Sequence, residues 1–109
     1  MTDAMVVLVT VGNVETARAL GDTLVGEALA ACVNVVPGIL SIYRWQGAIE
    51  RSDELLCLIK TTRAGFPRLR ARIVELHPYD VPEIIALPVE AGHAAYLDWI
   101  AASVRAPGD

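Results

Sequence analysis

The sequence predicts an α+β domain of the ferredoxin-like class, built in the order β-α-β-β-α-β with one more helix at the C-terminal end. Apolar, β-branched runs such as "MVVLV" and "LLCLI" are typical of strands. Other segments repeat apolar residues at the spacing of a helix face. A Gln46-Gly47 pair between two long apolar stretches is typical of a hairpin turn. The order of these segments along the chain indicates the fold class.

The first strand and the first helix are predicted near the start of the chain. Met5 to Val11 is apolar almost throughout, as expected of a strand that is buried on both faces. Gly12 ends this run, and Asn13 has a side chain suited to cap a helix N-terminus. Apolar residues then recur at helical spacing, so the first helix is predicted over residues 14–29.

A long hairpin is predicted next. Residues 31–45 indicate a strand interrupted at Pro37-Gly38, because proline lacks an N–H and glycine favours a bulge. The chain turns at Gln46-Gly47 and returns through residues 48–61 as the third strand. Each arm has about 15 residues, or about 50 Å at 3.3 Å per residue, so the hairpin is expected to protrude from its own domain.

The two cysteines are predicted to stay free. With the turn at Gln46-Gly47, Cys57 faces Val36 and Cys32 faces Thr61 across the hairpin. The offset between the thiols is about 13 Å of strand, beyond the ~7 Å limit for the Cα atoms of a disulfide. Both thiols are therefore expected to be buried and inert.

The second half of the chain predicts a helix, a strand and a last helix. Apolar residues over 66–76 mark one helix face, and Pro67 fits its first turn. His77-Pro78 ends that helix, and "VPEIIALPV", residues 81–89, predicts the fourth strand. Apolar residues over 96–104 mark the final helix.

One face of the predicted sheet has little to cover it. Right-handed connections place both crossover helices on the same side of the sheet. The runs "MVVLV" and "LLCLI" are nevertheless apolar at odd and even positions alike. The uncovered apolar face and the overlong hairpin together predict self-association.

Length and charge limit the class of protein. The 109 residues predict a single domain over 1–109. A net charge of -4 argues against a nucleic-acid-binding face. The apolar runs fall short of the ~20 residues that span a bilayer, and the start "MTDAM" carries an acid where a signal peptide carries a base. A cytoplasmic protein without nucleic-acid or membrane partners is expected.

Few residues belong to a motif with known chemistry. His77, Asp80, Glu83, Glu90 and His93 could bind a metal, but they lack a recognised ligand spacing, and His77 could instead cap the second helix. The sequence also lacks CxxC, GxGxxG and GxxxxGK motifs, and neighbouring motifs assemble no catalytic set. An enzyme is therefore not predicted.

Aromatic and basic side chains offer two further possibilities. Tyr43, Trp45, Tyr79 and Trp99 lie near the hairpin turn, the late strand and the last helix. They either pack within the fold or form the walls of a pocket between subunits. The second helix also carries a basic patch, either a solvated face or an anion site: Arg63, Arg68, Arg70 and Arg72.

Three stretches together resemble one protein family: "ACVNVVPGILSIYRWQGAIE", "LIKTT" and "ELHPYDVPEIIALPVEAG". They are similar to the CutA family, the divalent-cation tolerance proteins, and the similarity runs from Met5 to about Ser103. The resemblance implies a compact trimer with a ferredoxin-like fold, in which long hairpins pair between subunits and the sheets face one another. It also implies that His77, Tyr79 and Glu83 line an intersubunit cleft.

The resemblance implies a role in metal response. Bacterial members are associated with tolerance to copper and other divalent cations, and animal relatives with anchoring of acetylcholinesterase at membranes. The trimer also resembles the PII signalling proteins. Members credited with a copper site carry a cysteine late in the first strand and a histidine pair before "PY". This sequence has Val9 and Leu76-His77 there, so only His77 matches.

The hypothesis is a cytoplasmic homotrimer that takes part in the response to metal ions and is not an enzyme. It would bind Cu(II) or a similar divalent ion weakly through His77 and Glu83, without an obligatory cofactor. Its partners would be its own copies and divalent metal ions. The alternative is a PII-like signalling module that binds a small molecule or a protein in intersubunit clefts lined by Tyr43, Trp45 and Tyr79.

Overall fold

The secondary-structure elements follow one another in the predicted order, and the α+β class is confirmed. The computed structural model describes residues 2–106, so the ends of the predicted 1–109 domain, residue 1 and residues 107–109, lie outside the described residues. Within that range, no helix has the length and the apolar composition needed to cross a membrane. The elements are β1 (Ala4–Val11), α1 (Val14–Gly26), β2 (Cys32–Trp45), β3 (Ala48–Thr62), α2 (Phe66–Leu76), β4 (Ile85–Pro88) and α3 (Ala94–Ser103).

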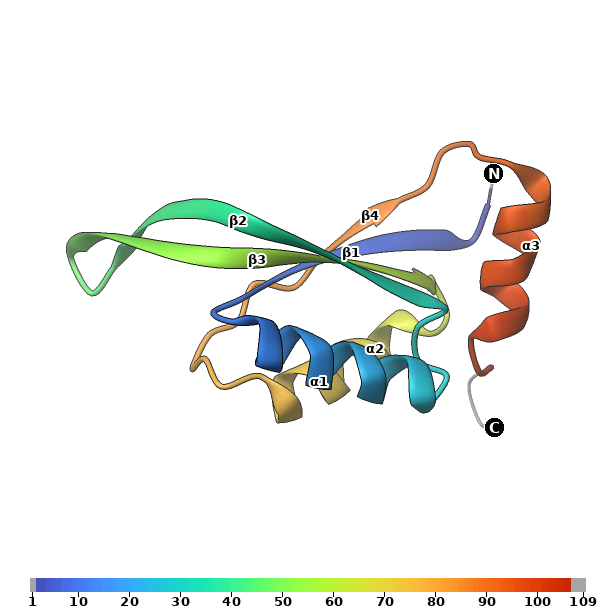
Figure 1. Cartoon of the computed structure of the whole chain (residues 1–109). Helices are drawn as coiled ribbons and strands as arrows, with labels where there is room; N and C mark the ends of the chain where they lie inside the picture. Colours follow the sequence, from blue (N-terminus) through green and yellow to red (C-terminus); the bar gives the residue numbers. More distant parts are fainter. Residues whose placement is uncertain (1, 107–109) are drawn as a thin grey trace.

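Four antiparallel strands form one sheet in the order β2-β3-β1-β4. Helices α1 and α2 lie against one face of this sheet (Figure 1). Alternate residues of the central strands point to that face, and Val7 and Val9 of β1 and Ile59 of β3 are fully buried there. They pack with Leu24 of α1 and Ile73 of α2. This two-layer packing is the predicted ferredoxin-like arrangement.

Helix α1 begins as predicted but ends earlier than predicted. The Asn13 side chain accepts a hydrogen bond of 2.8 Å from a backbone amide of the first turn and so caps the N-terminus. The helix ends at Gly26 rather than at residue 29, because Ala28 adopts a left-handed conformation with φ of 57°. The Leu29 amide then donates to the Leu24 carbonyl oxygen at 2.9 Å, and the Leu29 side chain is buried in the core.

The hairpin turn and the bulge lie where the sequence predicts them. Gln46 and Gly47 both have positive φ, 48° and 81°, as a type I′ turn requires. The register between β2 and β3 shifts between Val36 and Ile39. At this point Pro37-Gly38 of β2 lies opposite a single residue of β3, which defines a β-bulge.

The bulge corrects the predicted surroundings of the cysteines. Cys57 lies opposite Val35 and Cys32 lies opposite Lys60, each one residue away from the predicted partner. The shift arises because the extra residue in β2 moves the first half of that strand by one position. Both thiols are free, but Cys32 is only half-buried, whereas burial raises the pKa of the Cys57 thiol.

Strand β4 is shorter than predicted. Only Ile85–Pro88 pairs with β1, whereas the apolar pattern predicts a strand over residues 81–89. Pro82 has no N–H to donate to a ladder, and Tyr79 is held by a hydrogen bond to Glu54 of β3. The residues before β4 therefore leave the sheet and line the groove described below.

The second face of the sheet is largely uncovered. Helix α3 crosses one end of the sheet (Figure 1), where its Ile100 packs with Ala4 of β1. Away from α3, the face exposes apolar side chains, including Ile85 with 49% and Leu87 with 46% of its surface accessible. Figure 1 also shows the hairpin extending well past the two helices. An uncovered apolar face and a protruding hairpin are thus features of the single chain.

Candidate functional site

A groove with a volume of ≈ 690 Å³ lies beside the hairpin. One wall comes from β2 and β3, and the other comes from residues 79–83, which precede β4. The end of β1 contributes Thr10. The groove thus collects parts of the chain that are far apart in sequence, and it includes four residues that the sequence predicted as site residues: Tyr43, Trp45, Tyr79 and Glu83.

The bulge in β2 decides which hairpin side chains reach the groove. Residues that pair directly across antiparallel strands place their side chains on the same face. Ile39 pairs with Glu54, so the odd-numbered Tyr43 and Trp45 beyond the bulge share the face of Glu54. Before the bulge, the even-numbered Val36 lies on that face. One inserted residue therefore turns the two aromatic rings toward the acidic side chain.

His77, the predicted metal ligand, lies behind the groove rather than in its lining. Its side chain is buried, and its backbone caps α2 by donating to the Ile73 carbonyl at 2.8 Å. Its Nε2 lies 2.7 Å from the Thr10 carbonyl oxygen, and its Nδ1 accepts from the Tyr79 amide at 3.1 Å. A carbonyl only accepts and an amide N–H only donates, so the ring is neutral with its proton on Nε2. Both ring nitrogens are engaged, and a metal ion would have to displace one partner.

Tyr79 links the buried histidine to the groove. Its ring meets the His77 ring edge-on, with 4.5 Å between the centroids, and its hydroxyl donates to Glu54 Oε2 at 2.7 Å. Burial and the hydrogen bond to Glu54 raise the pKa of Tyr79 to about 12. A Cβ at Gly12 would lie 3.2 Å from the Tyr79 hydroxyl, so the glycine leaves room for the phenol. The hydroxyl stays protonated at neutral pH and acts as a donor.

Glu54 is a groove residue that the sequence analysis missed. Its side chain is 6% exposed, which is unusual for a carboxylate. One oxygen accepts from Tyr79, and no hydrogen bond to Oε1 occurs within residues 2–106. The stretch "DELLCLI" could have indicated that Glu54 is buried. Glu54 alternates with Leu56 and Leu58 along the strand, so it lies on the same apolar face as they do.

The groove is acidic and aromatic. Its ionisable lining consists of the carboxyl groups of Glu54, Asp80 and Glu83 and the tyrosine hydroxyls, and neither lysine nor arginine is part of it. The Ser52 hydroxyl donates to the Tyr43 hydroxyl at 3.4 Å, across the hairpin. In the part of the chain that the structure describes, no three His, Cys, Asp or Glu side chains converge as a metal cluster. The groove is therefore a surface of negative charge, which attracts cations in general.

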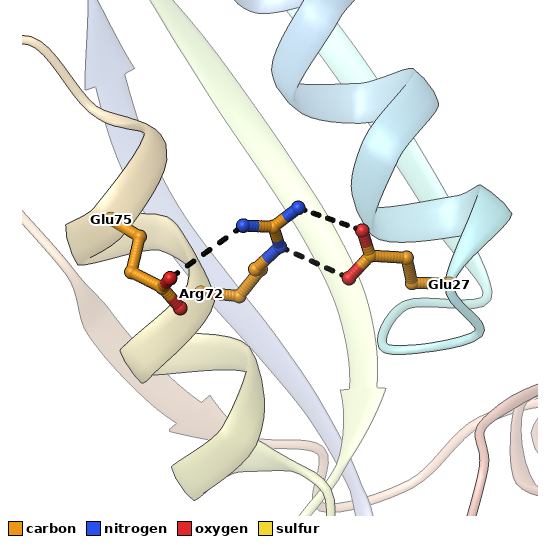
Figure 2. A network of polar contacts seen from close by, with 3 residues as sticks. All are labelled: Glu27, Arg72 and Glu75. Atoms are coloured by element: carbon orange, nitrogen blue, oxygen red, sulfur yellow. Dashed lines mark hydrogen bonds and ion pairs between the residues drawn. The ribbon is translucent and has the colours of Figure 1, made fainter.

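The predicted basic patch on α2 takes part in contacts within the chain and lies outside the groove. Figure 2 shows Arg72 between two carboxylates, with a bidentate pair to Glu27 at 3.0 and 2.9 Å and a longer contact of 3.7 Å to Glu75. The hydrogen bond from Arg72 lowers the pKa of Glu27. Arg68 donates to the Arg105 carbonyl at 2.6 Å. These contacts join α2 to the residue after α1 and to the C-terminal segment.

Comparison with known proteins identifies the family. Residues 5–103 match the family model described as CutA1 divalent ion tolerance protein. The chain belongs to the CutA1 family. The resemblance seen in the sequence is thus confirmed, and the matched range takes in the hairpin, the segment before β4 and every residue of the groove.

Individual CutA1 relatives are similar along nearly the whole chain. The divalent-cation tolerance protein CutA of Thermus thermophilus is 57% identical over 95 residues, which are 87% of this chain and 92% of that protein. The chloroplastic CutA 1 of rice is 44% identical over 94% of this chain, and the chain spans only 58% of its length. The crystal structure of CutA from Xylella fastidiosa has a TM-score of 0.93 at 39% identity, covering 95% of this chain and 100% of that one. The fold is therefore that of solved CutA structures.

Proposed function

We propose that this CutA1 chain acts in divalent-cation tolerance by binding rather than by catalysis. The observation that carries the proposal is the 57% identity to a protein named for divalent-cation tolerance over 87% of this chain. The experiment is growth of the source cells in rising copper with and without the gene. Cells without the gene are expected to stop growing at lower copper than cells that carry it. Equal copper limits in the two strains would refute the proposed role.

The proposed metal site is weak and contains His77 and Glu83. The imidazole and carboxylate suit Cu(II), the tightest-binding of the common divalent ions. Because both nitrogens of His77 are engaged, copper must first break the hydrogen bond to Tyr79 or to Thr10, at about 1 kcal/mol. Glu83 is exposed in the groove, so its carboxylate is open to an ion that enters there. Modest affinity for copper or a similar ion is therefore expected, in a site that the protein does not need for folding.

The proposed assembly is a homotrimer. Its support is the uncovered sheet face, where Leu8 and Leu58 pair across β1 and β3 and are flanked by the exposed Ile85. Apolar surface of this kind is stabilised by burial against another subunit, at about 25 cal/mol per Å². The sheets would then face one another, and the protruding hairpins would reach neighbouring subunits.

A second candidate function is that of a PII-like signalling module. The observation that favours it is the groove itself, whose volume of ≈ 690 Å³ falls within the range of small-molecule sites, about 300 to 1,000 Å³. In this proposal Tyr43, Trp45 and Tyr79 form the walls of a site for a small molecule or a partner protein. Binding in the groove would then signal that the ligand is present. Thermal-shift screening of the intact protein against metals and organic ligands separates this candidate from the first.

The proposed location is the cytoplasm. Both cysteines are free thiols, as is usual in a reducing compartment. One relative is named as chloroplastic, so the location differs within the family. Fractionation of the source cells tests the proposal, and recovery of the protein outside the cytoplasmic fraction would contradict it.

A further inference from the structure

We propose that residues 78–83, the strap between α2 and β4, open and close as a local unit, and that the hydrogen bond from Tyr79 to Glu54 is the latch that keeps them closed. Such a strap is a conformational device of the chain itself and depends on neither of the proposed functions. Residues 79–83 form one wall of the groove, so the latch sets how often that wall is in place.

The backbone of the strap is weakly tied to the rest of the fold. In the described part of the chain, none of its residues takes part in a backbone–backbone hydrogen bond, and pairing with β1 begins only at Ile85. Pro78 and Pro82 lack the N–H that such a bond needs. Val81, in the middle of the strap, has 70% of its surface exposed. Segments with few backbone hydrogen bonds and few buried contacts are those that open locally, at a lower free energy than global unfolding.

Both ends of the strap are fixed. His77, just before it, donates its backbone N–H to the Ile73 carbonyl at 2.8 Å, and its Nε2 donates to the Thr10 carbonyl oxygen at 2.7 Å. At the other end, Ile84 packs against the core and Ile85 pairs with β1. The helix and the strand on either side can therefore keep their contacts while the strap moves.

Within the described residues, a single side-chain hydrogen bond joins the strap to the sheet. The Tyr79 hydroxyl donates to Glu54 Oε2 at 2.7 Å. Glu54 lies on β3, which pairs with β1 on one side and with β2 on the other, and its side chain is 6% exposed. The acceptor is therefore held in place by the sheet. A hydrogen bond to a carboxylate is also stronger than one between neutral groups, so this one contact can hold the strap.

The Tyr79 amide distinguishes the closed strap from the open one. It donates to His77 Nδ1 at 3.1 Å, and the Tyr79 ring lies edge-on to the His77 ring, with 4.5 Å between the centroids. Because His77 belongs to the fixed end, the Tyr79 amide loses its acceptor when the strap lifts away. The backbone N–H of His77 keeps its own acceptor, so these two neighbouring amides separate local opening from global unfolding.

Amide hydrogen exchange of the intact protein, followed by NMR residue by residue without metal or ligand, tests the latch. Tyr79→Phe removes the hydroxyl, and we expect it to speed exchange of the amide of residue 79 about tenfold, because a bond to a charged acceptor is lost. The His77 amide is expected to change less than about twofold. Tyr43→Phe is the matched control, since it removes the hydroxyl that accepts from Ser52 on the opposite wall of the groove. It should leave both amides within about twofold of the wild-type rates.

Two further variants weaken the latch in other ways. Glu54→Gln keeps an acceptor of similar shape but removes its charge, so exchange of the Tyr79 amide should rise by a smaller factor than in Tyr79→Phe. Gly12→Ala leaves both partners in place and crowds the latch, because its Cβ would lie 3.2 Å from the Tyr79 hydroxyl. It should also speed exchange of the Tyr79 amide, again without an effect on the His77 amide.

The rates of the two amides decide the outcome. Faster exchange at residue 79 alone in the latch variants, with no change in Tyr43→Phe, supports the strap. Equal acceleration of both amides in Tyr79→Phe would show a loss of global stability and overturn the local opening. An unchanged rate at residue 79 in Tyr79→Phe, or a Tyr79 amide that is unprotected in the wild type, would overturn the latch. Because metal and ligand are left out, these results are independent of the copper growth test and of the ligand screen.

Discussion

At the scale of single residues, His77 shows how one side chain can match a ligand position and still be committed to structure. It ends α2, holds the Thr10 carbonyl on one nitrogen and the Tyr79 amide on the other, and positions Tyr79 for its bond to Glu54. Copper bound at His77, as we propose, would therefore compete with the contacts that shape the groove. Metal binding and groove geometry would then be linked.

Copper titration of His77→Ala measures that competition. If His77 is the proposed ligand, the variant should lose most of the copper affinity of the wild type, because it removes the imidazole. Glu83→Gln, which alters an exposed side chain, should weaken copper binding to a smaller extent. His93→Ala is the control, because His93 is an exposed imidazole at the start of α3. Equal affinities in wild type and His77→Ala would remove His77 from the site.

Tyr79 gives a pH prediction. Its folded-state pKa is raised to about 12 from the ordinary value of 10.0, so the folded state favours the protonated phenol. The resulting stabilisation is fully present below pH 10 and is lost as pH rises from about 10 to 12. Because the side chain is more than a third exposed, about 1 kcal/mol is expected. Urea denaturation at pH 9 to 11.5 should show a shallower decline for Tyr79→Phe than for wild type, and parallel curves would contradict the assignment.

At the scale of elements, the ends of helices and strands are set by single backbone positions. Helix α1 stops at Gly26 because Ala28 takes a left-handed conformation, and the register of the hairpin changes because Pro37-Gly38 inserts one residue. The early end of α1 lets Leu29 enter the core, and the bulge turns Trp45 toward the groove. Local irregularity and the candidate site are therefore connected.

Replacement of Ala28 by glycine should stabilise the protein. A non-glycine residue in the left-handed region costs about 1 to 2 kcal/mol, and glycine removes this cost. Part of the gain in stability is lost, because glycine makes the unfolded chain more flexible. Ala28→Gly is therefore expected to raise the free energy of unfolding by about 0.5 to 1 kcal/mol. Ala19→Gly, in the exposed middle of α1, should lower it by about 1 kcal/mol. The two effects are measured by chemical denaturation, and a shift of the same sign in both variants would contradict the role of Ala28.

At the scale of the whole molecule, the single chain leaves its sheet half covered. The helices bury one face of the sheet, α3 covers only the end of the other, and the hairpin projects beyond both helices (Figure 1). A single chain in this form exposes apolar side chains along both β4 and the hairpin. Association through that face would also place a neighbouring subunit near the groove, so assembly and ligand binding are expected to affect each other.

Sedimentation tests the trimer. The wild type is expected at about three times the chain mass of 11.7 kDa, and Leu87→Lys should reduce the mass because it places a charge on the exposed sheet face. Val74→Lys is the control, since Val74 is 55% exposed on α2, on the opposite side of the sheet. A wild type that sediments near the mass of one chain, or a Leu87→Lys variant with the full wild-type mass, would be inconsistent with the proposed interface.

Sequence by itself determined the fold class and most of its elements. Strand and helix periodicities, the Asn13 cap, the Gln46-Gly47 turn and the bulge at Pro37-Gly38 are local patterns, so they can be recognised from neighbouring residues alone. Three stretches together, residues 31–50, 58–62 and 75–92, also carried enough of the family pattern to indicate CutA1. The ends of α1 and β4 were wrong because an alanine in a left-handed conformation and the path of residues 79–83 depend on packing from elsewhere in the chain.

Tertiary structure alone decided the site. Tyr79 meets Glu54 across 25 positions of sequence, and the Thr10 carbonyl holds His77 from 67 positions away. The sequence predicted Tyr43, Trp45, Tyr79 and Glu83 as lining residues, but it could not show that both nitrogens of His77 are engaged or that the buried Glu54 accepts from Tyr79. The physical reason is that hydrogen bonds and desolvation act between atoms that the folded chain brings together, and periodicity along the sequence records only which face a residue occupies.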